Sequence, residues 1–533
     1  MLRIGDNCRR QFVCLAAGRR RRSDSGAFSI GRVSVAQSIP LPLRIDRESG
    51  VPYQHQIADQ LERFIFAGLL KPGDRLPSLV ELADSLAVSK NTVLGAFDKL
   101  SEVGFIQGLR GRGFFVSADG RALTAVPPVS APASAQPALT PDWLQQGSGV
   151  HIDPPAAPVR HDFKVGRPSA DAFPYRLWSR LSSELLRYAP GRQSMTEYVP
   201  ACGLWGLRMH IADYLGVAKA IRVEPEQVIV VAGIQEALSL LAGRFLGAGS
   251  VALAETPCYS GFYNLPELHR AKIRSVGVDD DGLRTDDLPL LAASPGRRAP
   301  LVYVTPAHQY PLGYTLSLAR RRALLAWAER NGAYVVEDDY DGDFRYEEAP
   351  LPSLMALGGG NVIHLGTFSK VLGPGLRLGY MVCPPDLVEE MARRKALLNN
   401  ACPSLDQAVM ARFFEDNNYA RHLHGLRRRY REQRDCLVAG LRRLFGADCR
   451  ISGEQAGMHL ALHLPAWLPS ARDVARTAMR CGVRVYTLSE SASTVEAGSD
   501  LDDRVLLFGY AALPTASIED ALGRLALAVD QLR

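Results

Sequence analysis

Three short segments place reactive side chains directly after apolar runs of the chain. Gly366–Lys370 ends in a lysine, Glu337–Asp341 contains four acids in five residues, and Gly233 opens an apolar stretch. A lysine at a strand end can form a Schiff base if its pKa is depressed. A buried acid there needs a cation or a protonated nitrogen as its partner, and a glycine at a helix start lets backbone N–H groups approach a phosphate.

Each of these segments also has an ordinary explanation when it is taken alone. Turns of the strand–glycine–helix type are common, and the acids of Glu337–Asp341 can simply form a solvated loop. A Ser-Lys pair occurs as Ser369-Lys370 and again as Ser89-Lys90, where no catalysis is expected. The order and spacing of the whole set therefore carry the interpretation, rather than any one member.

The elements that would position these side chains are buried strands of an α/β fold. Helical stretches separate most of the apolar runs, which is typical of a sheet covered by helices on both faces. Ligands bind at the carboxyl ends of the strands in such sheets, so the residues that follow each strand are expected to form the site. The predicted strands are Val228–Ala232, Leu301–Thr305, Tyr334–Glu337, Val362–Leu365 and Leu378–Cys383.

A second patterned unit, residues 44–117, is predicted to be a helix-turn-helix. Apolar residues in Gln54–Gly68 share one helical face, and Ser78 and Glu81 have the spacing of a capping box that starts a second helix. Ser89 can cap a third helix after a tight turn. The second and third helices would form the helix-turn-helix pair, in which the later helix enters the major groove with its N-terminus first. Its first turn carries Lys90, Asn91 and Thr92.

A glycine-rich hairpin is expected to follow the third helix. Gly104–Val116 has the pattern of two strands around a tight turn, and Arg110 and Arg112 would lie at its tip, placed for phosphates or a minor groove. An alternative is a three-helix module that binds protein, with solvated arginines. On the DNA-binding interpretation, the residues facing DNA are Ser78, Ser89, Lys90, Asn91, Thr92, Arg110 and Arg112.

Both units resemble known families. Pro52–Val116 resembles the winged-helix domain of the GntR family, although Val80 and Lys90 stand where that family often has arginine. Most of residues 161–533 resembles the fold-type-I aminotransferases, with further matches at Glu255–Tyr259 and Thr305–Gly313. Their order along the chain, with a linker between them, resembles the MocR subfamily of transcription regulators.

The second resemblance implies a site for pyridoxal 5′-phosphate. Lys370 would bind the cofactor covalently, Asp338 would pair with its ring nitrogen, Tyr340 would hydrogen-bond its phenolic oxygen, and Tyr259 would stack on its ring. Tyr198 would reach the phosphate of a neighbouring subunit. Ile234 stands where many members have a polar residue, so one phosphate contact is expected to be missing. The phosphate itself would be held by Gly233, Gln235, Thr367, Ser369 and Arg377.

The resemblance as a whole implies a pyridoxal-phosphate-dependent, amine-responsive transcription regulator of amino-acid, amine or vitamin B6 metabolism. It would be a head-to-tail homodimer that binds an operator near its own gene. One alternative is a working aminotransferase with an accessory DNA-binding domain, because the catalytic Lys370 and Asp338 are both present. Another is a structural module with a vestigial cofactor site.

The sequence leaves several alternatives for the effector, whereas it implies a single cofactor. Amino-acid-responsive relatives use arginines for the effector's carboxylate at positions that here hold Gly261 and either Glu490 or Ser491. Glu490 would instead favour a second amino group, as in a diamine. Alternatively, Glu490 is a solvated loop residue and Arg484 or Arg504 supplies the cation. A further possibility is that the cofactor itself is the signal.

Charge and composition set limits on these expectations. The net charge of the 533 residues is +6, and all of it lies in residues 1–43, a basic leader expected to be disordered. That leader would add salt-sensitive DNA affinity, or result from a start codon chosen too far upstream. Residues 118–160 are a Pro/Ala-rich linker. Nine scattered cysteines without a C-x-x-C pair predict reduced thiols in the cytoplasm and no metal site, and no apolar run approaches the roughly 20 residues of a membrane span.

Overall fold

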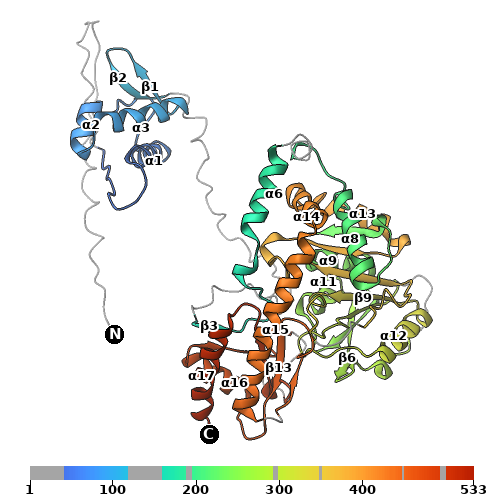
Figure 1. Cartoon of the computed structure of the whole chain (residues 1–533). Coiled ribbons are helices and arrows are strands. Elements are labelled where there is room, and N and C mark those ends of the chain that lie inside the picture. Colours follow the sequence, from blue (N-terminus) through green and yellow to red (C-terminus); the bar gives the residue numbers. More distant parts are fainter. Residues whose placement is uncertain are drawn as a thin grey trace, which may run out of the picture. The chain divides into compact units, whose positions relative to one another are not determined.

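The computed structural model of the chain describes residues 41–117, 159–187, 195–291, 298–346, 351–446, 449–492 and 500–533. Within it the chain forms two compact units, residues 1–138 and 139–533 (Figure 1). The expected leader and linker fall outside the described residues, apart from 41–43 and 159–160. No described helix is long and apolar enough to cross a membrane.

The small unit is a winged helix-turn-helix, as predicted. Ser78 accepts a hydrogen bond from Glu81 N at 3.2 Å and donates its own backbone N–H to the Glu81 carboxylate at 2.8 Å, so the capping box is complete. Ser89 caps the next helix by accepting from Thr92 N at 3.1 Å. The elements are α1 (Tyr53–Phe66), α2 (Leu79–Leu86), α3 (Lys90–Glu102) and the antiparallel strands β1 (Ile106–Leu109) and β2 (Gly113–Val116).

The core of the small unit extends further towards the N-terminus than residue 44. Leu43 is buried and Leu41 packs against the same cluster as Ile57 of α1 and Phe97 of α3. Two residues assigned to the leader by composition therefore belong to the folded unit, since their apolar side chains cover one end of its core.

The large unit is built on an eight-stranded sheet in the order β4-β11-β10-β9-β8-β5-β6-β7. Its β10, β9, β8, β5 and β6 run parallel, while β11 and β7 are antiparallel to their neighbours. The strands are β4 (Val228–Val231), β5 (Val251–Thr256), β6 (Lys272–Asp279), β7 (Gly282–Leu283), β8 (Leu301–Val304), β9 (Tyr334–Asp339), β10 (Val362–Thr367) and β11 (Gly379–Val382). All five predicted strands are present, with ends displaced by one or two residues.

Helices cover both faces of this sheet, as expected. Along β4, Val228 and Val230 belong to one apolar core, and Ile229 and Val231 belong to another on the opposite face. The helices of this region are α6 (Tyr175–Arg187), α8 (Trp205–Lys219), α9 (Ile234–Phe245), α10 (Ser260–Tyr263), α11 (Leu265–Leu268), α12 (Leu318–Arg330), α13 (Pro385–Asn399) and α14 (Ser404–Glu415).

A C-terminal lobe contains a second, four-stranded sheet in the order β12-β13-β16-β15. The short strand β3, at the start of the unit, pairs with β14 of this lobe, so the two ends of the large unit meet there (Figure 1). The elements are β3 (His161–Asp162), α15 (Asn418–Phe445), β12 (Ile451–Ser452), β13 (His459–His463), α16 (Ala471–Arg480), β14 (Val483–Arg484), β15 (Tyr486–Thr487), β16 (Val505–Gly509) and α17 (Thr515–Asp530).

Candidate functional site

The candidate site lies at the carboxyl edge of the large sheet. Strands β4, β9 and β10 point the same way, so the segments that follow them meet at one edge. Gly233, Asp338 and Lys370 come from these three strand ends. This is the edge at which ligands bind in open α/β sheets.

Lys370 is the candidate nucleophile of the site. Its Nζ donates a 3.0 Å hydrogen bond to the backbone oxygen of Gly166, and a Cβ at Gly166 would lie only 2.8 Å from Nζ. Burial lowers the pKa of the Lys370 ammonium, and the nearby carboxylates Asp341 and Asp338 oppose that shift. A lysine with a lowered pKa has a larger neutral, nucleophilic fraction at physiological pH.

The Asp338 carboxyl is buried, and only one of its two oxygens has a hydrogen-bond partner among the described residues. The hydroxyl of Tyr303 donates to Oδ2 at 2.6 Å, and Oδ1 has no partner among the described residues. Burial raises the pKa of the carboxyl to about 7, while the hydrogen bond from Tyr303 and the nearby Lys370 and His364 oppose the shift. A protonated ring nitrogen would satisfy Oδ1 and stabilise the charged carboxylate, so this residue fits the cofactor assigned to it by resemblance.

Two tyrosines of the predicted set line the same region. The Tyr340 hydroxyl donates to the backbone oxygen of His308 at 3.0 Å. The Tyr259 ring stands edge-on to Tyr310, with centroids 5.9 Å apart, and its hydroxyl donates to Gln235 Oε1 at 3.5 Å. Burial raises the pKa of both Tyr259 and Tyr340, so both remain hydrogen-bond donors at neutral pH.

A cradle for an anion forms where α9 begins. Gly233 precedes this helix with a φ of +105°, and a Cβ there would lie 3.2 Å from Nη2 of Arg377. The glycine thus lets the guanidinium approach a helix N-terminus, where free N–H groups and positive charge suit a phosphate. Thr367 and Ser369 lie on the same β10 segment, with the Ser369 N–H donating to Thr367 Oγ1 at 3.1 Å. The Tyr198 side chain, 91% exposed, projects into solvent.

The effector candidates of the C-terminal lobe are engaged with the lobe itself. Glu490 accepts from the backbone N–H of Thr487 at 2.9 Å. The Arg504 guanidinium donates to four backbone carbonyl oxygens, which gives it a structural role. Arg484 stacks over the Tyr486 ring at 4.8 Å.

The position of Gly261 has no room for a side chain as the site is arranged. A Cβ there would lie 2.3 Å from both Gln235 Oε1 and the Tyr259 ring. Gln235 also donates to the Gly261 backbone oxygen at 2.9 Å. A larger side chain at this position would therefore require Gln235 and Tyr259 to move.

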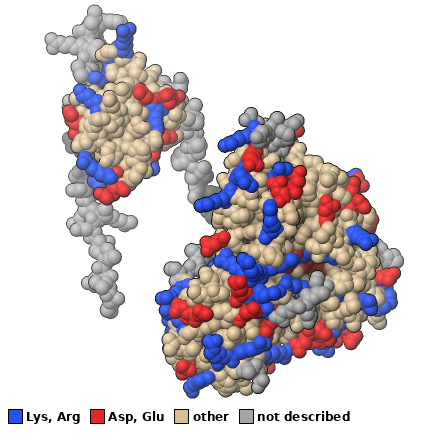
Figure 2. Space-filling view, in the orientation of Figure 1, with Lys and Arg blue, Asp and Glu red and all other residues tan. Residues whose placement is uncertain are grey.

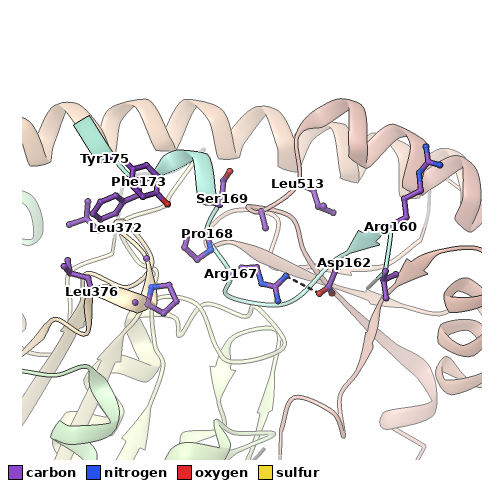
Figure 3. Close-up of a pocket in the computed structure, with 16 residues that line it drawn as sticks. Arg160, Asp162, Arg167, Pro168, Ser169, Phe173, Tyr175, Leu372, Leu376 and Leu513 are labelled. Carbon is purple, nitrogen blue, oxygen red and sulfur yellow. Dashed lines mark hydrogen bonds and ion pairs between the residues drawn. The ribbon is translucent and has the colours of Figure 1, made fainter. Parts of the chain in front are cut away.

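A cavity of about 690 Å³ lies beside the segment that holds Lys370 (Figure 3). Arg167, which follows Gly166 directly, lines it and donates to Asp162 at 3.2 Å. Phe173, Tyr175 and Leu372 give the cavity an apolar wall. None of the predicted cofactor residues lines it, so it is a neighbouring space rather than the site itself.

Three residues of the site were missed by sequence reasoning. Tyr303 lies inside a predicted strand and His308 inside the segment Thr305–Gly313. Neither position indicates in the sequence that its side chain contacts Asp338 or Tyr340. Gly166 lies 204 residues from its partner Lys370, and nothing in its surroundings indicates the contact.

The DNA-facing candidates of the small unit are mostly exposed. Lys90, Asn91, Arg110 and Arg112 are exposed, while Thr92 is half-buried. The hydroxyls of Ser78 and Ser89 are occupied by their helix caps. Figure 2 shows Lys, Arg, Asp and Glu interspersed on the visible face of this unit, which agrees with the zero net charge of residues 44–117.

Comparisons with known proteins match both units. The family model for aminotransferase class I and II matches residues 183–525, and the model for bacterial regulatory proteins of the gntR family matches residues 53–116. The "Probable rhizopine catabolism regulatory protein MocR" of Rhizobium meliloti is 34% identical over 78% of this chain and 83% of its own.

Two further proteins bear on the cofactor and the fold. The "HTH-type pyridoxine biosynthesis transcriptional regulator PdxR" of Corynebacterium glutamicum is 32% identical over 79% of this chain and 85% of its own. The solved structure of LysN, the alpha-aminoadipate aminotransferase of Thermus thermophilus in complex with N-(5′-phosphopyridoxyl)-L-leucine, is 29% identical. It covers 70% of this chain and 92% of its own, with a TM-score of 0.61.

Proposed function

The chain belongs to the MocR subfamily of GntR-family transcription regulators, and from this premise we propose that its large unit senses a primary amine through pyridoxal phosphate bound at Lys370. It is a DNA-binding regulator whose second unit has the fold of a cofactor-dependent aminotransferase. The observation that carries the proposal is a buried Asp338 oxygen without a partner among the described residues, near enough to Lys370 for the two charges to interact.

The residues of the site divide the work of holding the cofactor. When bound, pyridoxal phosphate supplies an aldehyde that binds primary amines covalently. Asp338 keeps the ring nitrogen protonated, Tyr340 donates to the phenolic oxygen, and Tyr259 covers one ring face. Gly233, Gln235, Thr367, Ser369 and Arg377 hold the phosphate.

The small unit reads the operator. Lys90, Asn91 and Thr92 at the start of α3 face base edges and phosphates of the major groove, and Arg110 and Arg112 contact the backbone or the minor groove. The Val80 side chain offers no hydrogen-bond donor where relatives often have arginine, so the operator preference of those relatives does not carry over to this chain.

The functional form is a head-to-tail homodimer with two DNA-binding units. The exposed Tyr198 reaches the phosphate site of the second subunit, which explains why a tyrosine of this kind is left in solvent in a single chain. Amine binding changes the population of dimer states and with it the spacing of the two winged helices. A cytoplasmic location follows from this role.

The effector is an amine, and two side chains support different second polar groups on it. Arg167 supports a carboxylate, because it follows the glycine hydrogen-bonded to Lys370 and is half exposed, and its ion pair with Asp162 would give way to the effector. Glu490 supports a second amino group, because its side chain is exposed at the end of the Thr487–Glu490 turn. Variants Arg167→Gln and Glu490→Gln separate the two, since each removes one charge and leaves the other.

The deciding experiment is a footprint of the DNA upstream of the protein's own gene. The full chain is tested with pyridoxal phosphate alone and with amino acids, diamines and taurine-like sulfonates added. We expect protection that at least one amine changes, and Lys370→Ala to keep folding and DNA binding but lose the response. An amine response that survives Lys370→Ala would overturn the proposal.

A working aminotransferase is the second candidate, supported by the presence of both Lys370 and Asp338 and by the likeness to LysN. Steady turnover of an amino donor with a keto acid would favour it. A single slow half-reaction fits a sensor instead, because a regulator needs binding rather than turnover.

A further inference from the structure

A buried cluster of three titratable side chains lies behind Tyr340, between the large sheet and the C-terminal lobe. His308 comes from the loop after β8, Asp341 from the segment after β9, and His459 opens β13. The side chains of His308 and His459 are fully buried and that of Asp341 is 1% exposed. The two imidazole rings lie 4.7 Å apart, centroid to centroid.

His308 contacts the Tyr340 hydroxyl with two of its own atoms. Nδ1 of the ring lies 3.0 Å from Asp341 Oδ2 and 3.1 Å from the hydroxyl oxygen, which itself donates to the His308 backbone oxygen at 3.0 Å. Nδ1 has at most one proton, which it would share between Asp341 Oδ2 and the hydroxyl oxygen. The hydroxyl has given its single proton to the carbonyl, and its oxygen therefore accepts from Nδ1.

Glycines from both sides of this junction enclose the His308 ring. A Cβ at Gly457 would lie 2.2 Å from Cε1 and 2.3 Å from Nδ1 of the ring. A Cβ at Gly453 or at Gly313 would lie 3.0 Å from Nε2. Gly453 and Gly457 belong to the connection between β12 and β13, so the C-terminal lobe fixes the orientation of a ring that belongs to the large sheet.

His459 completes the enclosure without adding charge. Its Nε2 contacts the backbone oxygen of Pro311 at 3.0 Å, and burial together with His308 and Lys370 holds its pKa well below the usual value. A neutral ring here keeps a second cation away from Lys370. The other titratable groups that interact with Tyr340, Asp341 or His459 are Tyr310, Asp338, Glu255, Lys370, Tyr346 and Tyr510.

We propose that His308 is a positioning residue for Tyr340. By donating from Nδ1 to the hydroxyl oxygen, it would hold that oxygen in place while the hydroxyl turns its single proton from the His308 carbonyl to the phenolic oxygen of the bound cofactor. Hydrogen bonds in such a chain strengthen one another. The assignment rests on the proposed function, in which Tyr340 touches the cofactor. Because Gly453 and Gly457 hold the ring, the strength of this contact depends on the seating of the C-terminal lobe.

The test uses the full chain loaded with pyridoxal phosphate and follows its visible absorption against pH. Donation to the phenolic oxygen stabilises the ionised form of that oxygen, so its loss makes proton uptake easier. His308→Gln, whose amide reaches the place of Nε2, is expected to raise the titration midpoint by on the order of one unit. His308→Asn puts an amide near Nδ1 and is expected to stay close to the wild-type midpoint.

A Tyr340→Phe background separates positioning from a general effect on the fold. There His308→Gln is expected to add nothing to the shift caused by Tyr340→Phe alone. A further shift as large as in the wild-type background would overturn the proposal, as would equal shifts for the Asn and Gln variants. If His308→Gln does not fold, the His308→Asn variant decides by itself. A titration midpoint in His308→Asn that is shifted as far as in Tyr340→Phe would also overturn the proposal.

Two controls keep the outcomes distinct. A wild-type chain that shows no visible band with pyridoxal phosphate refutes the proposed function, whereas a normal band with unshifted variants refutes only the role of His308.

The ligand atoms of His308, Asp341 and His459 also lie within 4.8 Å of one another, close enough to consider a metal ion. A stoichiometric divalent metal in the purified protein that His308→Gln removes would overturn the positioning role.

Discussion

The hydroxyl of Tyr303 donates a 2.6 Å hydrogen bond to Oδ2 of Asp338, which leaves Oδ1 as a buried acceptor without a partner in the described parts of the chain. Tyr303 thereby orients the carboxylate and directs its free oxygen. An unpartnered buried carboxylate oxygen costs free energy until a donor arrives. A protonated ring nitrogen of the cofactor would relieve this cost.

Replacing Asp338 by Asn is expected to weaken cofactor binding far more than Tyr303→Phe does. The amide keeps the shape of the carboxyl but carries no charge to hold the ring nitrogen protonated. Losing a charge-assisted hydrogen bond costs about 1.5–3 kcal/mol, or roughly a 10- to 150-fold higher Kd. Equilibrium dialysis with pyridoxal phosphate measures this. An unchanged Kd for Asp338→Asn would contradict the assignment.

The raised pKa of Asp338 predicts how the stability of the cofactor-free protein depends on pH. The carboxyl has a pKa of about 7 when folded, against an ordinary value of 3.8. Between these values the folded state binds the extra proton, so the contribution of Asp338 to stability is lost as pH rises from about 4 to 7. Glu255, whose pKa burial also raises to about 7, acts in the same direction.

Thermal midpoints of wild type and Asp338→Asn at pH 5 and pH 7.5 isolate this effect. The lowered pKa values of His459 and His463 act in the opposite direction, so only the difference between the two proteins is informative. The variant is expected to gain stability relative to wild type at the higher pH. A difference that stays constant between the two pH values would be evidence against a raised Asp338 pKa.

DNA contacts by the small unit are expected to appear in the salt dependence of operator binding. Lys90→Ala and Arg112→Ala each remove one candidate phosphate contact, and each is expected to lower the slope of log K against log salt by about 1. Lys99→Ala is the matched control, since it lies in the last turn of the same helix as Lys90. Equal slope changes for all three variants would argue that general charge, rather than placement, drives binding.

Local patterns explain how much of this structure could be predicted. Capping residues such as Ser78 and Ser89 set helix starts through contacts three residues away, so their effects are visible in the sequence. Strand β6 was not predicted, because the exposed polar residues Lys272, Arg274 and Ser275 leave no apolar run in its first half. The contact of Lys370 with Gly166 joins residues far apart in the chain, and only the folded sheet brings them together.

The approach of Arg377 to Gly233 predicts which part of the cofactor this pair recognises. Arg377→Lys keeps a charge but loses the planar fork that binds two phosphate oxygens. Gly233→Ala places a Cβ about 3.2 Å from the guanidinium in a strained backbone region. Both variants are expected to weaken binding of pyridoxal phosphate by about tenfold or more, while binding of pyridoxal, which lacks the phosphate, changes little. Competition dialysis with the two compounds measures the ratio directly. A parallel loss of both affinities would place the effect on the ring rather than on the phosphate.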